Sequence, residues 1–406
     1  MKSVQKQIEA LKRGVIDLIS EKELSDKLEK FTQEKKPLRV KLGVDPTAPD
    51  IHLGHTVVLQ KLRQFQDLGH IGVLIIGDYT AIVGDPSGTQ KTRPQLFESD
   101  IQLNAKTYFE QVQKILNMKR TEIRYNSEWF KKMLFSEVIQ LASRMTVARM
   151  LERDDFSKRF KKGTPICIHE FIYPLMQGYD SLMVKADVEL GGTDQLFNLL
   201  VGRQLQKEQG QEPQTILTTP LLPGTDGVQK MSKSLKNSID VSGPPREMYG
   251  KIMSISDDLM WNYYELLSRV PQAKILENQE KVSDGKLNPK TVKMELAFEL
   301  VERFYSREKA QFAADEFSNI FSSKKMPSSL ESVVITIKQE KIMVAKLIML
   351  AQCASSHTEA KRLIKQGAVT IEGQKIQDVN HEIPTKDQIV IKVGKRRFKK
   401  VIFKSP

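Results

Sequence analysis

The chain has 406 residues, of which 40% are apolar and 28% charged, and its formal net charge is +13. This length predicts two or three domains with a sizeable hydrophobic core. No apolar run approaches the roughly 20 residues of a membrane-spanning helix, and the N-terminus begins no signal-peptide core. The two cysteines lack metal-ligand spacing. These features predict a cytoplasmic protein with reduced thiols and no membrane partner.

The positive charge is concentrated toward the C-terminus. From Lys341 onward there are 14 lysines and arginines against 5 acidic residues, whereas the first 340 residues carry 49 against 45. A basic surplus confined to one segment is typical of a module that binds a polyanion such as nucleic acid. A solvated basic tail is the alternative that this feature leaves open.

Apolar periodicity predicts alternating helices and strands in the first half of the chain. The expected elements are helices over Val4–Ile19 and Glu21–Phe31, a strand over Leu38–Val44, a helix from about His55 to Leu68, a strand over Ile71–Ile76, a helix over Pro94–Leu116, a strand over Glu122–Tyr125, a helical insertion over about 127–178, a strand over Ala186–Leu190 and a helix to about Gln209.

These patterns predict an α/β fold with three domains. Residues 1–243 are expected to form a Rossmann-like, doubly wound parallel sheet whose last part, 215–243, is rich in loops. Residues 244–330 are expected to form an α-helical domain. A linker rich in serine and lysine, 322–332, precedes a small α+β domain over 340–406.

The stretch Asp45–His55 has the chemistry of a phosphate site. It joins a strand to a helix that begins near His52, Gly54 and His55. Helix N-termini present unpaired N–H groups, imidazoles donate to phosphate oxygens, and glycine leaves room for a base or ribose. A metal site is disfavoured because no third ligand accompanies the histidines. A pair of structural histidines is the other alternative.

The segment Lys230-Met-Ser-Lys-Ser234 is a second phosphate signal. Two lysines three residues apart in a mobile loop can close on a polyphosphate and counter the charge of a leaving pyrophosphate. Alone, such a loop is usually solvated surface. A glycine-punctuated loop, Gly77–Gly88, also follows a predicted strand, but it lacks the spacing of a Walker P-loop.

In this order and separation, the motifs resemble the two signatures of class I aminoacyl-tRNA synthetases. His52–His55 is similar to the HIGH motif, with leucine for isoleucine, and Lys230–Ser234 matches KMSKS at every position. The chain resembles the bacterial tyrosyl-tRNA synthetases in particular. The supporting stretches are Gly43–Ala48, Gly84–Gly88, Tyr173–Asp180 and Gly191–Gln195.

The resemblance implies a role for each matching residue. Asp85, Tyr173 and Gln177 would hold the ammonium of tyrosine, and Asp180 would accept a hydrogen bond from its phenol, so that phenylalanine would leave a buried polar group unpaired. On the ATP side, Thr47, His52 and His55 match the triphosphate contacts and Gly54 the surface under adenine. The remaining matches are Asp194 and Gln195 near the ribose and the reacting carboxylate, and Lys230, Lys233 and Ser234 in the pyrophosphate loop.

Two positions depart from the family pattern. Many members have a tyrosine where Lys41 stands, and a buried lysine here could pair with Asp180. Some members have a lysine directly after Gly88, so we favour Arg93 over Lys91 as a phosphate contact.

The resemblance implies a tyrosine–tRNA ligase. The carboxylate of L-tyrosine would attack the α-phosphate of ATP, and the adenylate would then pass tyrosine to the terminal ribose of tRNA(Tyr). Mg²⁺ would be carried mainly by the nucleotide, with no tightly bound protein metal. The resemblance also implies a homodimer, formed through the 127–178 insertion.

The C-terminal end has its own pattern, which resembles the small RNA-binding module named after ribosomal protein S-four. It reads as a helix, a second helix capped by Ser356 and Glu359, a glycine turn and a strand. The tail Lys392–Lys404 has seven basic and no acidic residues interleaved with apolar ones, which predicts a strand pair that faces RNA phosphates. A basic hairpin without RNA is the alternative.

Three other functions remain open. A tryptophanyl enzyme shares the scaffold, although the Tyr173, Gln177 and Asp180 spacing favours tyrosine. A catalytically idle RNA-binding paralogue would need neither intact motif. A HIGH-type nucleotidyltransferase without a tRNA would not need the basic module.

Overall fold

The structure is a computed structural model that describes residues 3–47, 49–87, 98–322, 331–337, 339–385, 388–394 and 397–404. The chain divides into two compact units, residues 1–311 and 312–406. The predictions for Gly88, Lys91 and Arg93, for the start of the helix expected at Pro94, and for most of the linker lie outside the described residues.

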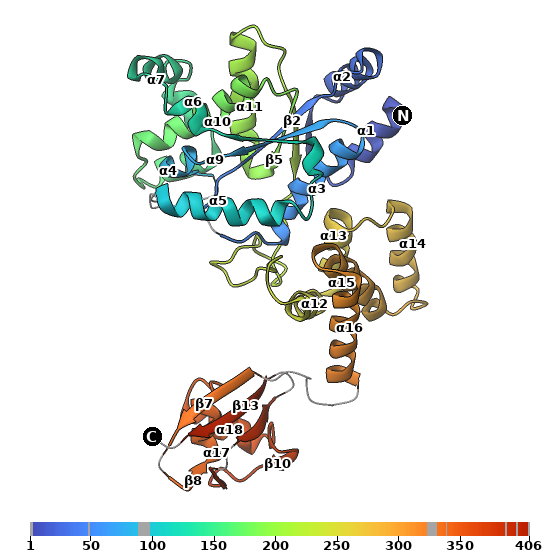
Figure 1. The fold of residues 1–406 in the computed structure, drawn as a ribbon, viewed down its shortest axis with the longest axis vertical. Coiled ribbons are helices and arrows are strands. Elements are labelled where there is room, and N and C mark those ends of the chain that lie inside the picture. The colour runs from blue at the N-terminus through green and yellow to red at the C-terminus, as the bar shows by residue number, and fades with distance from the viewer. Residues whose placement is uncertain are drawn as a thin grey trace. The chain divides into compact units, whose positions relative to one another are not determined.

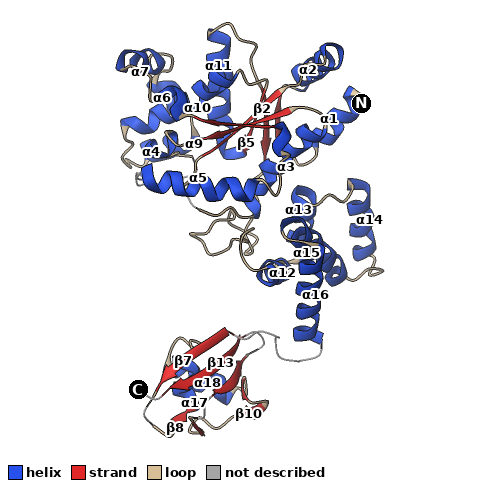
Figure 2. Ribbon diagram, viewed as in Figure 1, coloured by secondary structure: helices blue, strands red, loops and turns tan. Residues whose placement is uncertain are grey.

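A six-stranded sheet forms the centre of the first unit (Figures 1 and 2). The strand order is β1–β6–β5–β2–β3–β4, and every neighbouring pair is parallel except β1 with β6. The strands are β1 (Asp17–Ile19), β2 (Arg39–Val44), β3 (Ile71–Ile76), β4 (Thr121–Tyr125), β5 (Val188–Gly192) and β6 (Thr215–Thr219).

Helices cover both faces of this sheet, as Figure 1 shows for α3 and α5 on one face and α10 and α11 on the other. The predicted doubly wound α/β fold is thus confirmed. The helices before β6 are α1 (Val4–Lys12), α2 (Glu21–Glu34), α3 (Leu53–Asp67), α4 (Thr80–Val83), α5 (Glu98–Val112), α6 (Ser127–Phe130), α7 (Phe135–Ala142), α8 (Val147–Met150), α9 (Asp154–Lys161), α10 (Ile168–Val184) and α11 (Leu196–Glu208), with 3₁₀ turns η1 (Met118–Arg120) and η2 (Thr193–Gln195).

The order of connections makes the boundary between β2 and β5 the switch point of the sheet. From β2 the chain passes through β3 and β4 on one side, and then returns to β5 on the other side of β2. Doubly wound folds bind their ligands outside the carboxyl ends of the strands at such a point. Here those ends lead into Asp45 and into Gly192–Gln195.

Two strands and several helix ends differ from the sequence prediction. The helix expected over Val4–Ile19 ends at Lys12, and residues 17–19 form the half-buried edge strand β1. Three residues are too few to show a strand period. Strand β6 lies in the segment expected to be loops, although its run of threonine, isoleucine and leucine is fully buried. Helix α10 continues to Val184, past the expected end of the insertion.

The segment predicted to be helical from residue 244 is mostly helical as far as residue 322. Its helices are α12 (Pro245–Ser254), α13 (Asp257–Leu267), α14 (Gln272–Ser283), α15 (Pro289–Phe304) and α16 (Arg307–Ser322). Among the helices that the structure describes, none has the length and apolar character needed to cross a membrane.

The second unit has a five-stranded sheet in the order β10–β9–β12–β13–β7, and β8 pairs separately with β11. Its elements are β7 (Glu331–Thr336), β8 (Lys341–Met343), α17 (Val344–Leu350), α18 (His357–Lys365), β9 (Val369–Ile371), β10 (Gln374–Ile376), β11 (Glu382–Pro384), β12 (Gln388–Val393) and β13 (Arg397–Lys404). The sheet takes in β7, which precedes the predicted start of this domain at residue 340 and runs parallel to β13.

The predicted cap of α18 forms in part. Ser356 Oγ accepts from the backbone N–H of Glu359 at 3.1 Å. The Glu359 carboxylate does not return to the Ser356 backbone but accepts from the backbone N–H of Ser355 at 2.7 Å. The cap therefore closes one residue earlier than a standard capping box.

Candidate active site

The two histidines of the Asp45–His55 stretch lie at the start of α3. His52 is the N-cap residue, and its backbone N–H donates to His55 Nδ1 at 3.2 Å. The two rings stack with their centroids 3.9 Å apart. Because Nδ1 accepts a hydrogen bond, the neutral His55 ring carries its proton on Nε2, and that N–H remains the donor for a ligand.

The environment keeps both histidines neutral. Burial and the charge of Lys233 lower the pKa of His52 to about 4. The pKa of His55 is also lowered, by the surrounding protein first and then by His52 and the two loop lysines, although its side chain is exposed. A Cβ on Gly54 would lie 3.0 Å from the His52 ring, so a side chain here would crowd that ring. The site thus offers imidazole N–H donors to an anion.

The Lys230–Ser234 loop packs against the start of α3. Met231 is buried, and its Cβ lies 3.5 Å from the position of a Cβ on Gly54. Lys233 Nζ pairs with Asp50 Oδ2 at 2.8 Å. Lys230 Nζ lies 3.9 Å from Asp194 Oδ2. Both lysines therefore reach carboxylates in the segments that follow β2 and β5.

The other predicted ATP residues lie around this loop. Ser234 is exposed, and its Oγ lies 2.9 Å from Ser232 Oγ. Thr47 is exposed in the loop after β2, where its backbone N–H donates to the carbonyl of Asp45 at 2.8 Å. Asp194 lies in the 3₁₀ turn η2, and burial raises its pKa against the opposing effect of Lys230.

We expect Asp50→Asn to lower the KM for ATP by up to about fivefold, the scale of an exposed ion pair. The reason is that Lys233 must leave the Asp50 carboxylate before it can contact a triphosphate. Pyrophosphate exchange at varied ATP concentration measures this. Ser242→Ala is the control, because it removes only the 3.1 Å hydrogen bond to the other Asp50 oxygen. A higher KM in Asp50→Asn would show that Asp50 assists ATP binding instead.

Asp180 lies on α10 and is almost fully buried. Its Oδ1 accepts from Trp129 Nε1 at 2.9 Å and its Oδ2 from Asn126 Nδ2 at 3.4 Å. Burial raises the pKa of Asp180 to about 7, while Lys41 and the two donors oppose that rise. Asp180 is therefore held in a fixed orientation by neutral donors, as a hydroxyl acceptor must be.

A second group of predicted residues is connected by hydrogen bonds of side-chain amides. Gln195 Nε2 donates to Asp85 Oδ2 at 2.9 Å. Asn198 Nδ2 lies 3.0 Å from Gln195 Oε1 and 2.9 Å from Gln177 Oε1. The structure thus brings Asp85, Gln177 and Gln195 together, from three separate parts of the chain, and adds Asn198 as their link.

Tyr173, the remaining residue predicted at the ammonium, is held by the loop after β2. Its hydroxyl donates to Asp45 Oδ2 at 2.8 Å. The other Asp45 oxygen accepts from Thr80 Oγ1 at 2.8 Å, and Thr80 Oγ1 accepts from Asn126 at 3.0 Å. Burial first and then the charge of Asp45 raise the pKa of Tyr173. Tyr173 therefore joins the loop after β2 to the residues that hold Asp180.

Arg153 is a site residue that no sequence motif identified. It is buried under the predicted ammonium site, where it donates to Ser87 Oγ at 2.6 Å and to Asn198 Oδ1 at 3.2 Å, and it lies 3.8 Å from Asp85 Oδ1. Its guanidinium also lies over the ring of Phe156. Trp129 and Asn126 were missed for a similar reason. Arg153 and Trp129 come from the helical insertion, Asn126 directly precedes it, and none of the three lies in a recognisable motif.

Lys41 is buried, but it does not pair with Asp180. Its Nζ pairs with Glu189 Oε1 at 2.8 Å, and it also donates to the Gln177 carbonyl and to Ser181 Oγ, each at 2.7 Å. The expected Lys41–Asp180 pair is therefore wrong. Glu189 lies on β5 and is the register partner of Lys41 on β2. The sequence alone does not reveal this register.

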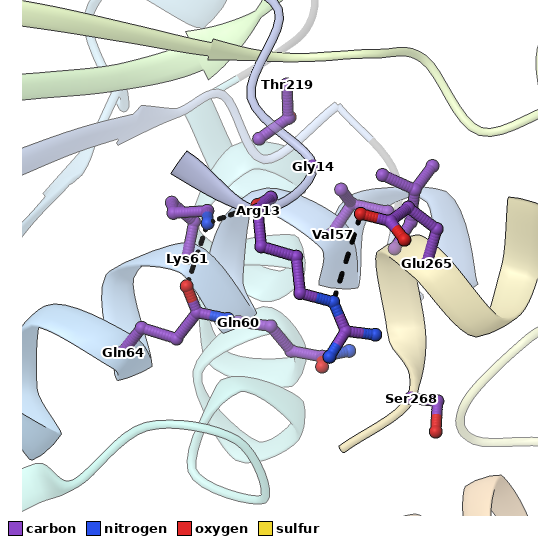
Figure 3. Close-up of a pocket in the computed structure, with 10 residues that line it drawn as sticks. Arg13, Gly14, Val57, Gln60, Lys61, Gln64, Thr219, Glu265 and Ser268 are labelled. Atoms are coloured by element: carbon purple, nitrogen blue, oxygen red, sulfur yellow. Dashed lines mark hydrogen bonds and ion pairs between the residues drawn. The ribbon is translucent and has the colours of Figure 1, made fainter. Parts of the chain in front are cut away.

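A small pocket elsewhere in the first unit is a structural junction (Figure 3). Lys61 Nζ donates to the carbonyls of Leu11 and Arg13 and to Gln64 Oε1, at 2.7–2.8 Å. Arg13 Nε lies 3.9 Å from Glu265 Oε1. Since all three donors of Lys61 are already used, this pocket ties α3 to α13 and the N-terminal segment and offers no free ammonium to a ligand.

The described residues form no cluster of side chains that could bind a metal ion. Over the ranges given above, no group of three or more His, Cys, Asp or Glu side chains is placed to hold an ion. Cys167 is exposed and Cys353 is buried, and no disulfide joins these two residues.

Comparisons with known proteins agree with this architecture. The family model for class I tRNA synthetases (W and Y) matches residues 33–322, and the model for the tyrosine--tRNA ligase SYY-like C-terminal domain matches residues 316–401. The tyrosine--tRNA ligase of Carboxydothermus hydrogenoformans is 54% identical over 98% of both chains. That of Thermotoga maritima is 53% identical over 98% of this chain and 97% of the relative.

Solved structures share the fold at lower identity. A C-terminally truncated mitochondrial tyrosyl-tRNA synthetase from Aspergillus nidulans has a TM-score of 0.64 at 24% identity, and covers 79% of this chain and 95% of its own. The tryptophanyl-tRNA synthetase of Plasmodium falciparum has a TM-score of 0.57 at 17% identity, and covers 78% and 89%. At full-length identities above 50% to curated relatives, the chain belongs to the tyrosine--tRNA ligase family of class I tRNA synthetases.

Proposed function

We propose that the chain joins L-tyrosine to ATP to give tyrosyl-adenylate and pyrophosphate, and then transfers tyrosine to the 3′-terminal ribose of tRNA(Tyr). One observation carries this proposal. The switch point between β2 and β5 has neutral histidines and two loop lysines on one side. On the other side it has the buried, oriented Asp180 and a group formed by Asp85, Gln195 and Gln177. These groups suit a triphosphate and a zwitterion with a phenol.

The triphosphate would lie along the start of α3. His52 and His55 donate from uncharged rings, Gly54 leaves the surface flat under the adenine, and Thr47 adds a donor at the phosphates. Lys230 and Lys233 supply two positive charges from the facing loop, and Ser234 supplies a hydroxyl. Asp194 accepts from the ribose. Mg²⁺ enters as part of the ATP complex.

Tyrosine would lie along α10. Asp180 accepts the phenol hydrogen bond, and Trp129 and Asn126 hold its carboxylate in place. The ammonium meets one carboxylate, Asp85, and the neutral side chains of Tyr173 and Gln177. Gln195 orients the substrate carboxylate. A hydroxyl acceptor at the pocket floor disfavours phenylalanine, because its ring would leave Asp180 without that partner.

The reaction needs neither an enzyme nucleophile nor a general base. A tyrosine carboxylate oxygen forms a bond to the α-phosphorus of ATP, the bond from that phosphorus to the bridging oxygen breaks, and pyrophosphate leaves with the electron pair. The protein aligns the two reactants and neutralises the leaving group with Lys230 and Lys233. A ribose hydroxyl of the tRNA then attacks the activated carbonyl, and AMP leaves.

The second unit would contact the tRNA. Lys361, Arg362 and Lys365 are exposed on α18, and β12 and β13 carry further lysines. Lys392 lies over the Phe398 ring between these two strands. Exposed basic groups on a small rigid fold can bind RNA phosphates through shape and charge.

We place the functional divisions of the chain at 1–243 for catalysis, 244–330 for the anticodon side and 340–406 for RNA binding, and the enzyme in the cytoplasm. We also propose a homodimer. The insertion exposes several large apolar side chains that a second copy would cover. They are Leu134, Phe135, Ile139, Val147, Phe160 and Ile168.

Charging of tRNA(Tyr) with labelled tyrosine tests the function as a whole. We expect tyrosyl-tRNA to form only with ATP and tRNA(Tyr) present. An idle RNA-binding paralogue would bind the tRNA and leave it uncharged. A nucleotidyltransferase without a tRNA would consume ATP and neither bind nor charge the tRNA.

A further inference from the structure

We propose that the buried Lys41–Glu189 ion pair is the positioning element of the amino-acid pocket, which sets how tightly tyrosine is bound. This inference rests on the proposed function, because it concerns the same pocket. It assigns to Lys41 and Glu189 a role that acts through Gln177 and Asp180 and needs no contact with the substrate.

The pair lies at the switch point itself. Lys41 of β2 and Glu189 of β5 are direct partners in the strand register, and neither side chain is exposed. Nζ and Oε1 are 2.8 Å apart. The ion pair therefore joins two neighbouring strands from which the chain continues in opposite directions along the sheet, from β2 to β3 and from β5 to β6.

The ion pair forms hydrogen bonds with two residues of α10, Gln177 and Ser181. Lys41 Nζ donates to the carbonyl of Gln177 and to Ser181 Oγ, so that all three N–H bonds of the ammonium are used. Ser181 Oγ donates to Glu189 Oε2 at 3.1 Å, and Gln214 donates to the same oxygen. Gln177 Nε2 lies 3.4 Å from Glu189 Oε1. The network therefore holds both the backbone and the side chain of Gln177.

From Gln177 the hydrogen bonds continue to the predicted ammonium site. Its Oε1 accepts from Asn198, which also contacts Gln195, and Gln195 donates to Asp85. Because the Gln177 amide nitrogen faces Glu189, its oxygen is turned toward Asn198. Loss of the ion pair would allow the Gln177 amide to rotate, and the hydrogen bonds that lead from Gln177 to Asp85 would no longer have a fixed geometry.

The pair also sets the charge near Asp180. The groups that act on the Asp180 carboxyl are Lys41 from β2, Glu189 from β5, and the donors Trp129 and Asn126, while Tyr173 lies close on the same helix. Lys41 lowers the pKa of Asp180 and Glu189 raises it. Removal of Lys41 alone would raise that pKa further and leave the carboxyl protonated at neutral pH.

Stability alone does not account for this pair. Burying two charges carries a desolvation penalty that the attraction between them often only balances, and apolar replacements are frequently neutral or stabilising. What methionine at position 41 and glutamine at position 189 cannot supply is a donor for the Gln177 carbonyl and an acceptor at both oxygens of the Glu189 carboxylate, one of which faces the Gln177 amide and the other Ser181. A stabilising role and a positioning role therefore predict different results for the double substitution Lys41→Met with Glu189→Gln.

The experiment measures tyrosine-dependent and ATP-dependent pyrophosphate exchange in the full chain, together with the melting temperature, for Lys41→Met, Glu189→Gln and the double variant. We expect Lys41→Met to raise the KM for tyrosine by about tenfold or more, the scale of one misplaced pocket hydrogen bond, with the KM for ATP nearly unchanged. The double variant should melt at a higher temperature than Lys41→Met, because no unpaired buried charge remains, and still show the raised KM for tyrosine.

Arg159 and Glu170 provide a matched control. They form another buried ion pair, 2.5 Å apart, at the start of the same helix. Arg159→Met with Glu170→Gln should change the melting temperature and leave the KM for tyrosine within about twofold. If both pairs changed the KM for tyrosine equally, the effect would be general softening of α10 and the proposal would be wrong.

The pH profile adds a measurement that a purely structural role would not alter. Between pH 6.5 and 8.5, the KM for tyrosine of Lys41→Met should fall as the pH rises, because Asp180 regains its charge, and it should change less in Glu189→Gln. If the Lys41 variants do not fold, the Glu189→Gln variant tests the proposal by itself, because glutamine keeps the shape of the glutamate side chain. It should raise the KM for tyrosine and not for ATP.

Two outcomes separate this inference from the proposed function. If the unaltered chain exchanges pyrophosphate with tyrosine, and folded Glu189→Gln and double variants keep its KM for tyrosine and its pH profile, the inference is overturned and the function stands. If the unaltered chain shows no exchange with tyrosine, the proposed function itself fails.

Discussion

Lys233→Ala is expected to slow tyrosyl-adenylate formation by about 10²- to 10³-fold, the usual loss for one group aimed at transition-state charge. Lys233 lies in the loop that packs against the start of α3, within reach of any triphosphate bound there. Charge on the pyrophosphate grows as it leaves, so the contribution of the lysine is largest in the transition state. The KM for tyrosine should stay within about twofold, because the pocket on α10 is untouched.

Stopped-flow or quenched measurement of adenylate formation checks this prediction, with tyrosine affinity measured separately. Lys236→Gln is the control, because it neutralises an exposed lysine three residues further along the same loop. Equal losses of rate and of tyrosine affinity in Lys233→Ala would mean that the loop supports the whole site, and the transition-state role would be wrong.

Removal of residues 323–406 is expected to leave adenylate formation intact and to reduce charging of tRNA(Tyr) by about 10²-fold at physiological salt, because several phosphate contacts are lost together. The cut follows α16 and removes the whole second sheet, including β7, whereas a cut at residue 340 would leave β7 without β13. The second unit has its own apolar core, built from α17, α18 and the inner faces of its strands.

The full chain should lose tRNA affinity steeply between 50 and 200 mM salt, and the shortened chain less steeply, because each basic contact adds to the slope. A full-length variant with Lys361, Arg362 and Lys365 changed to glutamine keeps the fold and should reproduce part of the loss. Loss of adenylate formation in the shortened chain would contradict the division of labour between the two units.

The sequence allowed the fold class to be predicted, and it named most of the residues of the candidate site, because both rest on local signals. The buried run of β3 and the helix start at His52 depend on neighbours in the chain, and family motifs located the residues around the switch point. The predicted groups Asp85, Gln177 and Gln195 do lie together, and Lys233 does face the loop after β2. Their roles in binding stay predictions.

The remaining features depend on contacts between distant segments. Strand β1 has three residues and is recognisable only by its pairing with β6. The partner of Lys41 is set by the register of β2 against β5, which no local pattern encodes. Arg153 and Trp129 reach the site from the helical insertion, where isolated polar residues and aromatic residues are usually surface or core. Such residues become evident only when the tertiary structure is known.

The central claim is that this site activates tyrosine, and amino-acid-dependent ATP–pyrophosphate exchange tests it most directly. Each amino acid is supplied alone with ATP and labelled pyrophosphate, and the rate of label entry into ATP is measured. We expect rapid exchange with tyrosine, and little with phenylalanine or tryptophan. Exchange driven by tryptophan and not by tyrosine, or no exchange with any amino acid, would contradict the account.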